Sequence, residues 1–575
     1  TMEDSEKIMN TGQQSPKTAA KSKDQMLSGA AWRTGADMIG KILGVIYIIP
    51  WYAWMGRFGN EANSLFSMGY NIYALFLLIS TVGIPAAIAR EVARYNTLDD
   101  PNMAYRLVRQ MLGVMLVLGI VASGLMFFLA GPLSALVGGK DSADLIPVMK
   151  SLALAVLIFP SMSVIRGYFQ GLNQVKAYAM SQLLEQIVRV IWMLAATFAI
   201  MKLGSHNWQN AVTQSTLAAF IGMLGSYAVL FYYLQKSGNL NKLINPGPVK
   251  SKINALEIFR STLHTAIPFI VIGSAIQIFK IIDNSTFMNM MPWVTNYSHN
   301  ELLVLMSYFS ANTDKLTMVL LGVALTLGSV SDPLITEHYV QGNRRELATL
   351  VGYNFQLYVG FMLPAVIGMS LLTKPIYTIF YQIPSGLQSS LFVFAILQTF
   401  LLGLYMIVYP PLTVMDHKRL AMRIFTLTLV IKLVLQVPMI LIFHTYGPLL
   451  ATTVSFLVGV FLFIRKLHEL THFSIKNTVR RIQGATLLTG FMAIVVIIVE
   501  IILGFIFGKS PGRIASVFIA AIAGGAGFYT YLWFAAKLGL LEKWFGPRGL
   551  SLRRKYLIKN KSVSKKVTDR LINKS

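Results

Sequence analysis

The hydrophobic positions of the chain form long runs that recur from near residue 26 to near residue 537. Each run holds about 20 or more mostly apolar residues, which is the length that a helix needs to cross a bilayer. The pattern predicts an all-α polytopic membrane protein with fourteen transmembrane helices. The predicted spans lie near 26–56, 63–89, 106–131, 145–171, 176–203, 209–235, 260–290, 302–337, 347–372, 387–414, 419–444, 447–467, 484–508 and 513–537.

A polar segment rich in lysine, asparagine, glycine and proline separates the first six spans from the next six. We therefore expect two pseudo-symmetric six-helix lobes followed by two further helices. A weak internal repeat supports this duplication, since Lys176 and Met180 recur as Lys418 and Met422 after matching connections. The expected domains are a cytoplasmic N-terminal tail (1–25), an N-lobe (26–235), a cytoplasmic linker (236–259), a C-lobe (260–467), spans 13 and 14 (484–537) and a basic cytoplasmic tail (538–575).

Composition agrees with a membrane protein, because 55% of the residues are hydrophobic and only 13% are charged. The net charge of +26 comes largely from connections after even-numbered spans and from the tail. Lysine and arginine favour cytoplasmic loops, so both termini are expected in the cytoplasm and the first span acts as the insertion signal. Attraction of the tail to anionic membrane lipids accounts for the excess charge, and we expect no nucleic-acid partner. The chain has no cysteine, which excludes a disulfide framework and a thiolate metal site.

Several ionisable side chains interrupt the apolar runs. Arg33, Asp37 and Lys41 recur every four residues, so they share one face of the first span. Charges at mid-bilayer are costly, and this face must therefore contact protein or water. Two interpretations are open: Asp37 neutralises its neighbours in a structural ion pair while Arg33 reaches the membrane surface, or the three residues line a cavity.

Two further pairs stand at helical spacing. Glu185 and Arg189 are four residues apart, and Lys280 and Asp283 are three apart, so pairing within one helix is the simplest interpretation. Together with Arg166 they also fit a hydrated, charged cavity between helices. Asp332, Glu337 and Glu500 are isolated carboxylates. Asp283, Asp332 and Glu337 are candidates for ion coupling, and Glu500 can be protonated in place.

Two segments carry a family resemblance: GIPAAIAREVARYN at 83–96 and RGYFQGLNQVKAYAMSQLLEQIVRV at 166–190. With them the chain resembles the polysaccharide-biosynthesis branch of the multidrug/oligosaccharidyl-lipid/polysaccharide exporter superfamily. It is most similar to the SpoVB- and YtgP-like proteins of Gram-positive bacteria, relatives of the lipid II flippases, and the resemblance covers nearly the whole chain. The Gram-negative flippases have S-R-x-L-G-x-x-R-D in the first helix, whereas here GKILGVIYI keeps one cation, Lys41, and replaces the Arg-Asp pair by Tyr47 and Ile48.

The resemblance implies a central cationic cavity that moves an undecaprenyl-diphosphate-linked cell-wall precursor, above all lipid II, to the outer leaflet by alternating access. Spans 13 and 14 would guide the lipid tail. The implied cavity residues are Arg33, Asp37, Lys41, Arg166, Gln170, Glu185, Arg189 and Lys280. The expected location is the bacterial cell membrane, and the expected partner is the polyprenyl-linked glycan. We expect a monomer, with cell-wall synthesis enzymes as candidate contacts.

No catalytic residue, metal site or cofactor is expected, since no phosphate-binding loop or histidine cluster is present. The membrane potential, H⁺ or Na⁺ remain candidate energy sources. Three alternatives stay open: a flippase for teichoic acid or capsule repeats, a cation-coupled multidrug exporter, and a membrane-embedded transferase. The exporter would favour acidic and aromatic cavity residues, whereas the deep charges here include prominent arginine and lysine. The transferase would need catalytic groups in a sizeable external loop, and the outward connections are short.

Overall fold

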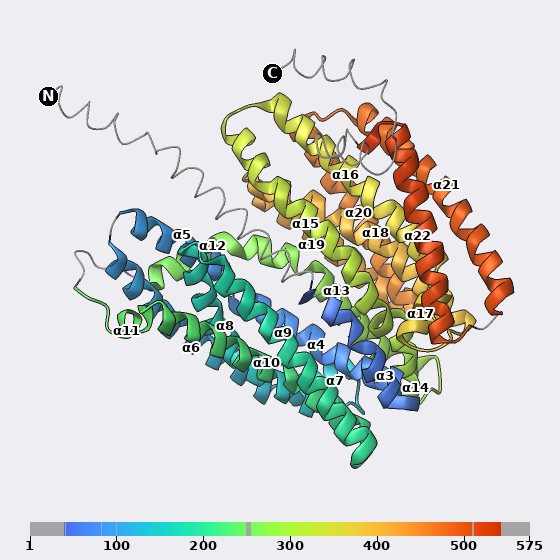
Figure 1. Cartoon of the computed structure of the whole chain (residues 1–575), viewed down its shortest axis with the longest axis horizontal. Coiled ribbons are helices and arrows are strands. Elements are labelled where there is room, and N and C mark those ends of the chain that lie inside the picture. Colours follow the sequence, from blue (N-terminus) through green and yellow to red (C-terminus); the bar gives the residue numbers. More distant parts are fainter. Residues whose placement is uncertain are drawn as a thin grey trace. The chain divides into compact units, whose positions relative to one another are not determined.

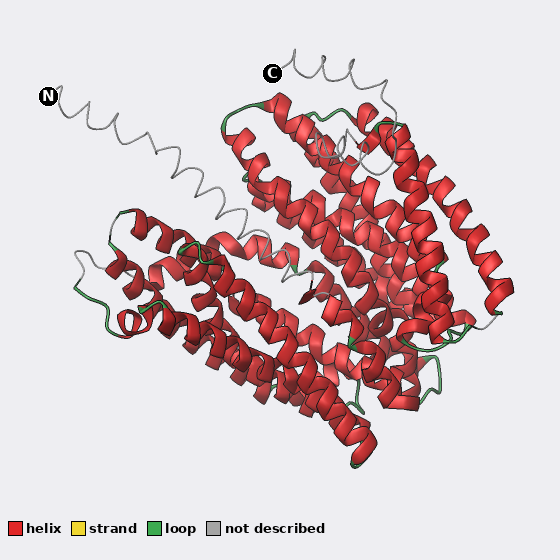
Figure 2. Ribbon diagram, viewed as in Figure 1, coloured by secondary structure: helices red, strands yellow, loops and turns green. Residues whose placement is uncertain are grey.

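A computed structural model describes residues 39–541, apart from positions 41, 82, 99, 249–254, 509 and 510. Over these residues the chain forms helices joined by turns and loops, with no strand (Figure 2). The predicted all-α class is confirmed. The predicted terminal tails lie outside the described residues, except for the first few positions after 537.

The described chain divides into two compact units (Figure 1). The first unit runs up to Pro292 and includes Tyr297–Leu303, and the second contains Trp293–Asn296 and continues from Val304. Helices of the first unit are α3 (Ile48–Met55), α4 (Gly59–Thr81), α5 (Ile84–Thr97), α6 (Pro101–Phe128), α7 (Ala130–Gly138), α8 (Leu145–Gly171), α9 (Val175–Phe198), α10 (Trp208–Lys236), α11 (Asn239–Ile244), α12 (Ala255–Gly273) and α13 (Ala275–Met290). Helix α14 (His299–Met306) crosses the boundary. Helices of the second unit are α15 (Asn312–Val340), α16 (Arg344–Leu371), α17 (Thr373–Phe380), α18 (Gly386–Val414), α19 (Lys418–Phe443), α20 (Gly447–Thr471), α21 (Ile475–Phe507) and α22 (Arg513–Lys537).

Several of the long helices begin at ordinary capping residues. Asp100, Asn207, Asn343 and Ser474 each accept a hydrogen bond from a backbone N–H in the first turn of the helix that follows. Such caps satisfy N–H groups that have no partner inside the helix. They set the starts of α6, α10, α16 and α21 within a few residues of the predicted spans, except for α21, which begins nine residues earlier than predicted.

Ten helical segments within the described residues are long and apolar enough to cross a membrane. Two of them, 42–97 and 418–471, each overlap two predicted spans. The membrane class is therefore confirmed, whereas the count of fourteen stays a prediction. The seventh predicted span is divided at Ser274 into α12 and α13, and the short helices α7 and α17 lie in connections where no helix was predicted.

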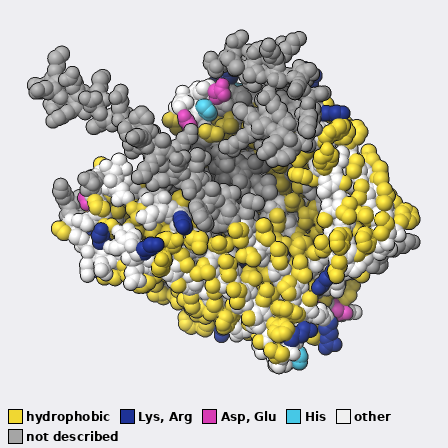
Figure 3. All heavy atoms as spheres, in the orientation of Figure 1, with side chains coloured by type: hydrophobic (Ala, Val, Ile, Leu, Met, Phe, Trp, Pro, Cys, Tyr) yellow, Lys and Arg dark blue, Asp and Glu magenta, His cyan; other side chains and the backbone are white. Residues whose placement is uncertain are grey.

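The exterior suits a lipid environment. Hydrophobic side chains cover most of the described surface in Figure 3, with lysine and arginine towards its margins. Large apolar residues are strongly exposed, as at Phe128 (83%) and Phe505 (87%). A soluble monomer rarely exposes such extensive apolar surface, so these side chains face hydrocarbon.

Packing groups α12 and α13 with the first unit. Helix α12 packs against α5 and α6, and α13 packs against α4 and α7. The predicted domain boundaries remain predictions, but residues 255–290, which the sequence assigns to the C-lobe, belong to the first compact unit. The polar linker marks a change in composition, whereas the packing of α12 and α13 depends on the folded structure, which composition does not reveal.

Candidate functional site

A buried ion pair joins α8 to α9 in the first unit. Arg166 Nη2 lies 2.7 Å from Glu185 Oε2, and the two residues are 8% and 7% exposed. The guanidinium also donates to Ser181 Oγ at 3.1 Å and to Ser226 Oγ at 2.9 Å. The charge of Arg166 is thus neutralised and hydrogen-bonded inside this unit, as a buried ion pair requires.

Close helix packing explains how these side chains meet. A Cβ atom on Gly222 of α10 would lie 2.6 Å from the backbone oxygen of Glu185, so only glycine allows α9 and α10 to approach this closely. Ser226 follows Gly222 by one turn and therefore faces the same side of α10. A Cβ atom on Gly167 would likewise lie 2.6 Å from the Pro85 oxygen, which fixes α8 against α5.

Arg189 has a different environment from Arg166. Its guanidinium carbon lies 4.9 Å from the centre of the Tyr70 ring, and the residue is half-buried. No ion pair joins Arg189 to a carboxylate in the part of the chain that the structure describes. The expected pairing of Glu185 with Arg189 is therefore wrong, because the α8–α9 contact gives Glu185 a nearer partner. Arg189 remains the cation of this cluster whose charge is not neutralised.

Aromatic side chains of α4 extend the cluster. The Tyr70 ring stacks on Phe66 with centroids 4.8 Å apart and contacts Tyr73 at 5.1 Å. Tyr73 is 4% exposed and interacts electrostatically with Glu185. This cluster of the first unit thus places Arg166, Arg189 and Glu185 beside the tyrosines of α4, with a net positive charge available to an anion.

The other predicted site residues are distributed over several helices. Gln170 is half-buried in the last turn of α8. Lys280, half-buried, and Asp283, 8% exposed, lie on α13, which packs against α4 and α7. Arg33, Asp37 and Lys41 lie outside the described residues.

The candidate ion-coupling residues of the second unit differ in burial. Asp332 is half-buried on α15 and lies near Tyr409 of α18. Glu337 is exposed and accepts a hydrogen bond from Gln341 Nε2 at 3.2 Å, and Glu500 is half-buried on α21. Of the two candidate ion-coupling residues on α15, Asp332 is therefore the one placed where it could carry a proton or a cation within the helix bundle.

Sequence reasoning missed Lys432, which is 0% exposed in the middle of α19. Its ammonium donates to Thr452 Oγ1 at 2.6 Å and to the Pro448 carbonyl at 3.2 Å, so it joins α19 to the first turns of α20. The signal was present as a lone lysine in the apolar stretch LTLVIKLVL. Such a lysine marks a buried, oxygen-rich contact, because an unsatisfied ammonium is too costly inside a membrane protein.

We expect Thr452→Val to lower the free energy of unfolding by about 1.5–3 kcal/mol, since a hydrogen bond to a charged group is worth that much. Thr426→Val is the matched control, because the Thr426 hydroxyl is exposed and bonds only to its own helix. Thermal unfolding of both variants in detergent measures the difference. Equal midpoints for the two variants would show that Lys432 does not depend on Thr452.

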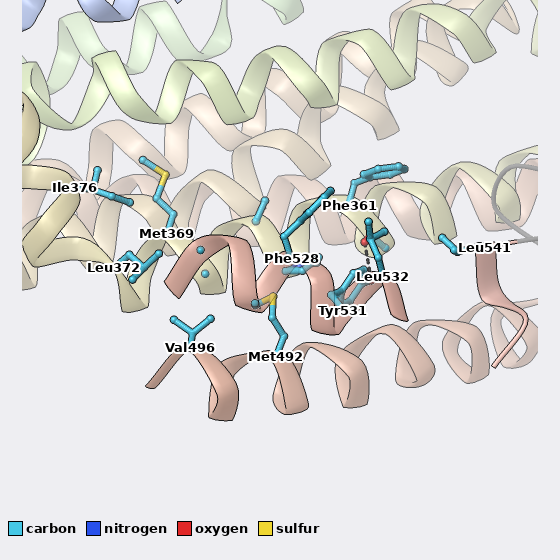
Figure 4. Close-up of a pocket in the computed structure, with 16 residues that line it drawn as sticks. Phe361, Met369, Leu372, Ile376, Met492, Val496, Phe528, Tyr531, Leu532 and Leu541 are labelled. Carbon is cyan, nitrogen blue, oxygen red and sulfur yellow. Dashed lines mark hydrogen bonds between the residues drawn. The ribbon is translucent and has the colours of Figure 1, made fainter. Parts of the chain in front are cut away.

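The second unit also contains an apolar groove of about 390 Å³ between α16, α17, α21 and α22. Figure 4 shows Met492 and Val496 on one side, Phe361 and Met369 on the other, and Phe528 between them. Tyr531 closes part of it by donating to the Gly360 carbonyl at 2.7 Å. The glycines at 360, 368, 524 and 527 line the groove without side chains that would fill it. Its lining is suited to hydrocarbon and offers almost no polar group.

Comparison with known proteins shows the family to which the chain belongs. Residues 26–338 match the model of the family described as polysaccharide biosynthesis protein. The chain is 32% identical to lipid II flippase MurJ of Bacillus subtilis (strain 168), over 91% of this chain and 97% of that protein. It is 29% identical to stage V sporulation protein B of the same organism, over 36% of this chain and 39% of that protein.

Solved structures show the same fold. A structure of lipid II flippase MurJ in an inward closed conformation aligns with a TM-score of 0.59 and 15% identity, over 88% of this chain and 99% of that one. An inward-facing multidrug resistance MATE family transporter aligns with a TM-score of 0.57 and 17% identity, over 75% and 96%. These relatives are flippases and transporters rather than enzymes. The chain is a multi-pass membrane protein that belongs to the polysaccharide biosynthesis protein family and has the transporter fold of the multidrug/oligosaccharidyl-lipid/polysaccharide superfamily.

Proposed function

We propose that this protein moves a polyprenyl-diphosphate-linked cell-wall precursor, with lipid II as the first candidate, from the inner to the outer leaflet of the bacterial cell membrane. The observation that carries the proposal is the 32% identity to a lipid II flippase over nearly the full length of both chains. The arginine cluster and the apolar groove give the proposal a chemical basis. A lipid-linked diphosphate combines an anionic headgroup with a long hydrocarbon tail, and the chain has a feature suited to each.

The headgroup end of the substrate is assigned to Arg189. Guanidinium presents several N–H donors in a planar fork that matches phosphate oxygens, and its bonds to an anion are charge-assisted. Arg166 takes a supporting role, because its donors already bind Glu185, Ser181 and Ser226. Within the first unit, Arg189 binds the diphosphate while the Arg166–Glu185 pair holds α8, α9 and α10 in register.

The energy source is assigned to the membrane potential. An anion that leaves a negative cytoplasm gains roughly 2.3 kcal/mol per charge for each 100 mV, so two charges supply about 4–5 kcal/mol. Both termini are placed in the cytoplasm, which puts the basic tail beside anionic lipids. A proton or Na⁺ bound at Asp332 would add a second driving force.

The apolar groove is assigned to the polyprenyl tail. We expect Gly524→Leu to fill part of it, because a Cβ atom added at position 524 would lie 3.4 Å from Leu372 Cδ1 in the groove lining. Loss of contact with two methylene groups costs about 1.6 kcal/mol, which is roughly a tenfold weaker tail interaction. The measurement is binding of a polyprenyl diphosphate to the protein in nanodiscs.

The control for this prediction is Gly525→Leu. Gly525 adjoins Gly524 but is exposed, and a Cβ atom there would meet nothing within 4 Å. It should bind the polyprenyl diphosphate as the wild type does. Equal weakening in both variants would show that the groove does not hold the tail.

A second candidate substrate is another polyprenyl-linked glycan, favoured by the match to the polysaccharide biosynthesis protein family. Expression in bacteria depleted of their own lipid II flippase separates the two candidates. Restored growth together with lipid II in the outer leaflet supports lipid II as the substrate. Inserted protein without either effect contradicts that assignment.

A further inference from the structure

One face of α13 carries polar atoms that find no protein partner. Ser274, Gln277 and Asn284 follow each other at spacings of three and seven, which places them on the same side of the helix. Ser274 Oγ, Gln277 Oε1 and both amide atoms of Asn284 have no hydrogen-bond partner among the residues that the structure describes. Ser274 is 1% exposed and Asn284 is 0% exposed, so bulk solvent does not reach them.

The adjoining face of α13 is held against α7. Ser285 Oγ and Asn289 Nδ2 both donate to the Leu136 carbonyl near the C-terminus of α7, at 2.5 and 3.0 Å. Asn284 precedes Ser285, so it is turned about 100° away from this contact. The remaining long helix against which α13 packs closely is α4. Asn284 therefore faces α4.

Helix α4 also carries a buried amide side chain, that of Asn71. Asn71 is 6% exposed, and its Nδ2 has no hydrogen-bond partner in the described part of the chain. A Cβ atom on Gly69 would lie 2.5 Å from Val148 of α8, so the Gly69 side of α4 faces α8. Asn71 lies about 200° around the helix from Gly69, on the side away from α8.

We propose that Asn71, Ser274, Gln277 and Asn284 hold ordered water in a polar seam between α4 and α13. Buried amides and hydroxyls are satisfied by protein groups or by bound water, and these four lack the protein groups. Water both donates and accepts, which matches the mixture of N–H donors and oxygen acceptors here.

The seam has a consequence that rests on the proposed function. A contact already lined by water separates without exposing a dry core, so α13 can part from α4 more easily than from α7. Transport requires the two units to change conformation. Within the first unit, the seam is the helix contact that we expect to open. Replacing its polar groups by apolar ones should therefore slow transport while leaving the fold intact.

Hydroxyl-radical footprinting of the full chain in nanodiscs tests for the water directly, because radicals form at ordered water beside buried side chains. Phe287 and Met288 adjoin Asn284 and are 0% and 3% exposed. We expect both to be labelled in the wild type, with labelling several-fold lower in Asn284→Leu. Met111 and Met115 of α6 are equally buried and should be protected in both proteins. Protection of Met288 equal to that of Met111 in the wild type would overturn the proposal.

Stability and transport of Asn284→Leu test the functional step. We expect an unchanged or higher melting temperature and at least a tenfold lower rate of lipid II transport. Asn239→Leu is the matched control, since Asn239 is a buried amide that already binds Tyr105 Oη at 3.0 Å. It should lower the melting temperature and leave the rate per folded molecule unchanged.

The two claims fail separately. If wild-type protein shows the expected labelling but moves no lipid II, the proposed function is wrong and the water seam stands. If Asn284→Leu loses the labelling yet transports at the wild-type rate, the role of the seam in transport is wrong.

Discussion

Arg189→Ala is expected to reduce transport of lipid II by tenfold to about 150-fold while the protein still folds. A charge-assisted hydrogen bond to an ionised group contributes about 1.5–3 kcal/mol, which sets this range. The guanidinium is half-buried over the Tyr70 ring and forms no ion pair in the described chain, so its removal leaves no unpaired carboxylate behind. Transport in proteoliposomes, normalised to folded protein, measures the effect.

Two further variants sharpen that experiment. Arg189→Lys keeps the charge but loses the planar fork, and it should retain part of the activity. Arg94→Ala removes a 65% exposed side chain at the end of α5 and should transport as the wild type does. An Arg189→Ala protein with wild-type transport would remove Arg189 from the substrate site.

The second large effect is expected on folding rather than on transport. Glu185→Ala leaves the Arg166 guanidinium buried without its carboxylate, and breaking such a pair costs about 3–5 kcal/mol. We therefore expect a steep loss of folded protein, measured as the monodisperse fraction in size-exclusion chromatography and as the melting temperature. Replacing both residues, as Arg166→Met with Glu185→Met, should recover much of the loss, because no charge then remains unpaired.

The control for the folding prediction is Glu91→Ala. Glu91 pairs with Arg94 at 3.4 Å on the surface, where an ion pair contributes about 0–1 kcal/mol. A Glu185→Ala protein that folds as well as Glu91→Ala but no longer transports would contradict the structural role of the pair. Arg166 and Glu185 would then belong to the substrate site, as the family resemblance implies.

The positions of the helices were predictable where the length of an apolar run alone defines a membrane span. Apolar runs near 145–171 and 513–537 agree closely with α8 (Leu145–Gly171) and α22 (Arg513–Lys537). The break of the seventh span at Ser274 was not predicted, because the surrounding residues remain apolar and no proline stands at the junction. Helices α7 and α17 were missed because each is too short to resemble a span.

The site was predictable in its residue types but not in its pairings. Spacing along α9 favoured a Glu185–Arg189 pair, whereas the partner of Glu185 comes from α8. That partner depends on the close approach of α10 to α9 at Gly222 and of α8 to α5 at Gly167, which a single sequence does not reveal. The groove of the second unit could not be predicted from the sequence, because its lining residues are as apolar as those that face lipid.

The most direct test of the central proposal is a lipid II transport assay with purified protein in proteoliposomes that carry a membrane potential. We predict that lipid II placed in the inner-equivalent leaflet becomes accessible in the opposite leaflet, faster when that leaflet's side is positive, and that Arg189→Ala largely abolishes the movement. Correctly inserted wild-type protein that moves no lipid II above the rate of protein-free vesicles, at any potential, would contradict the assignment of lipid II as its substrate.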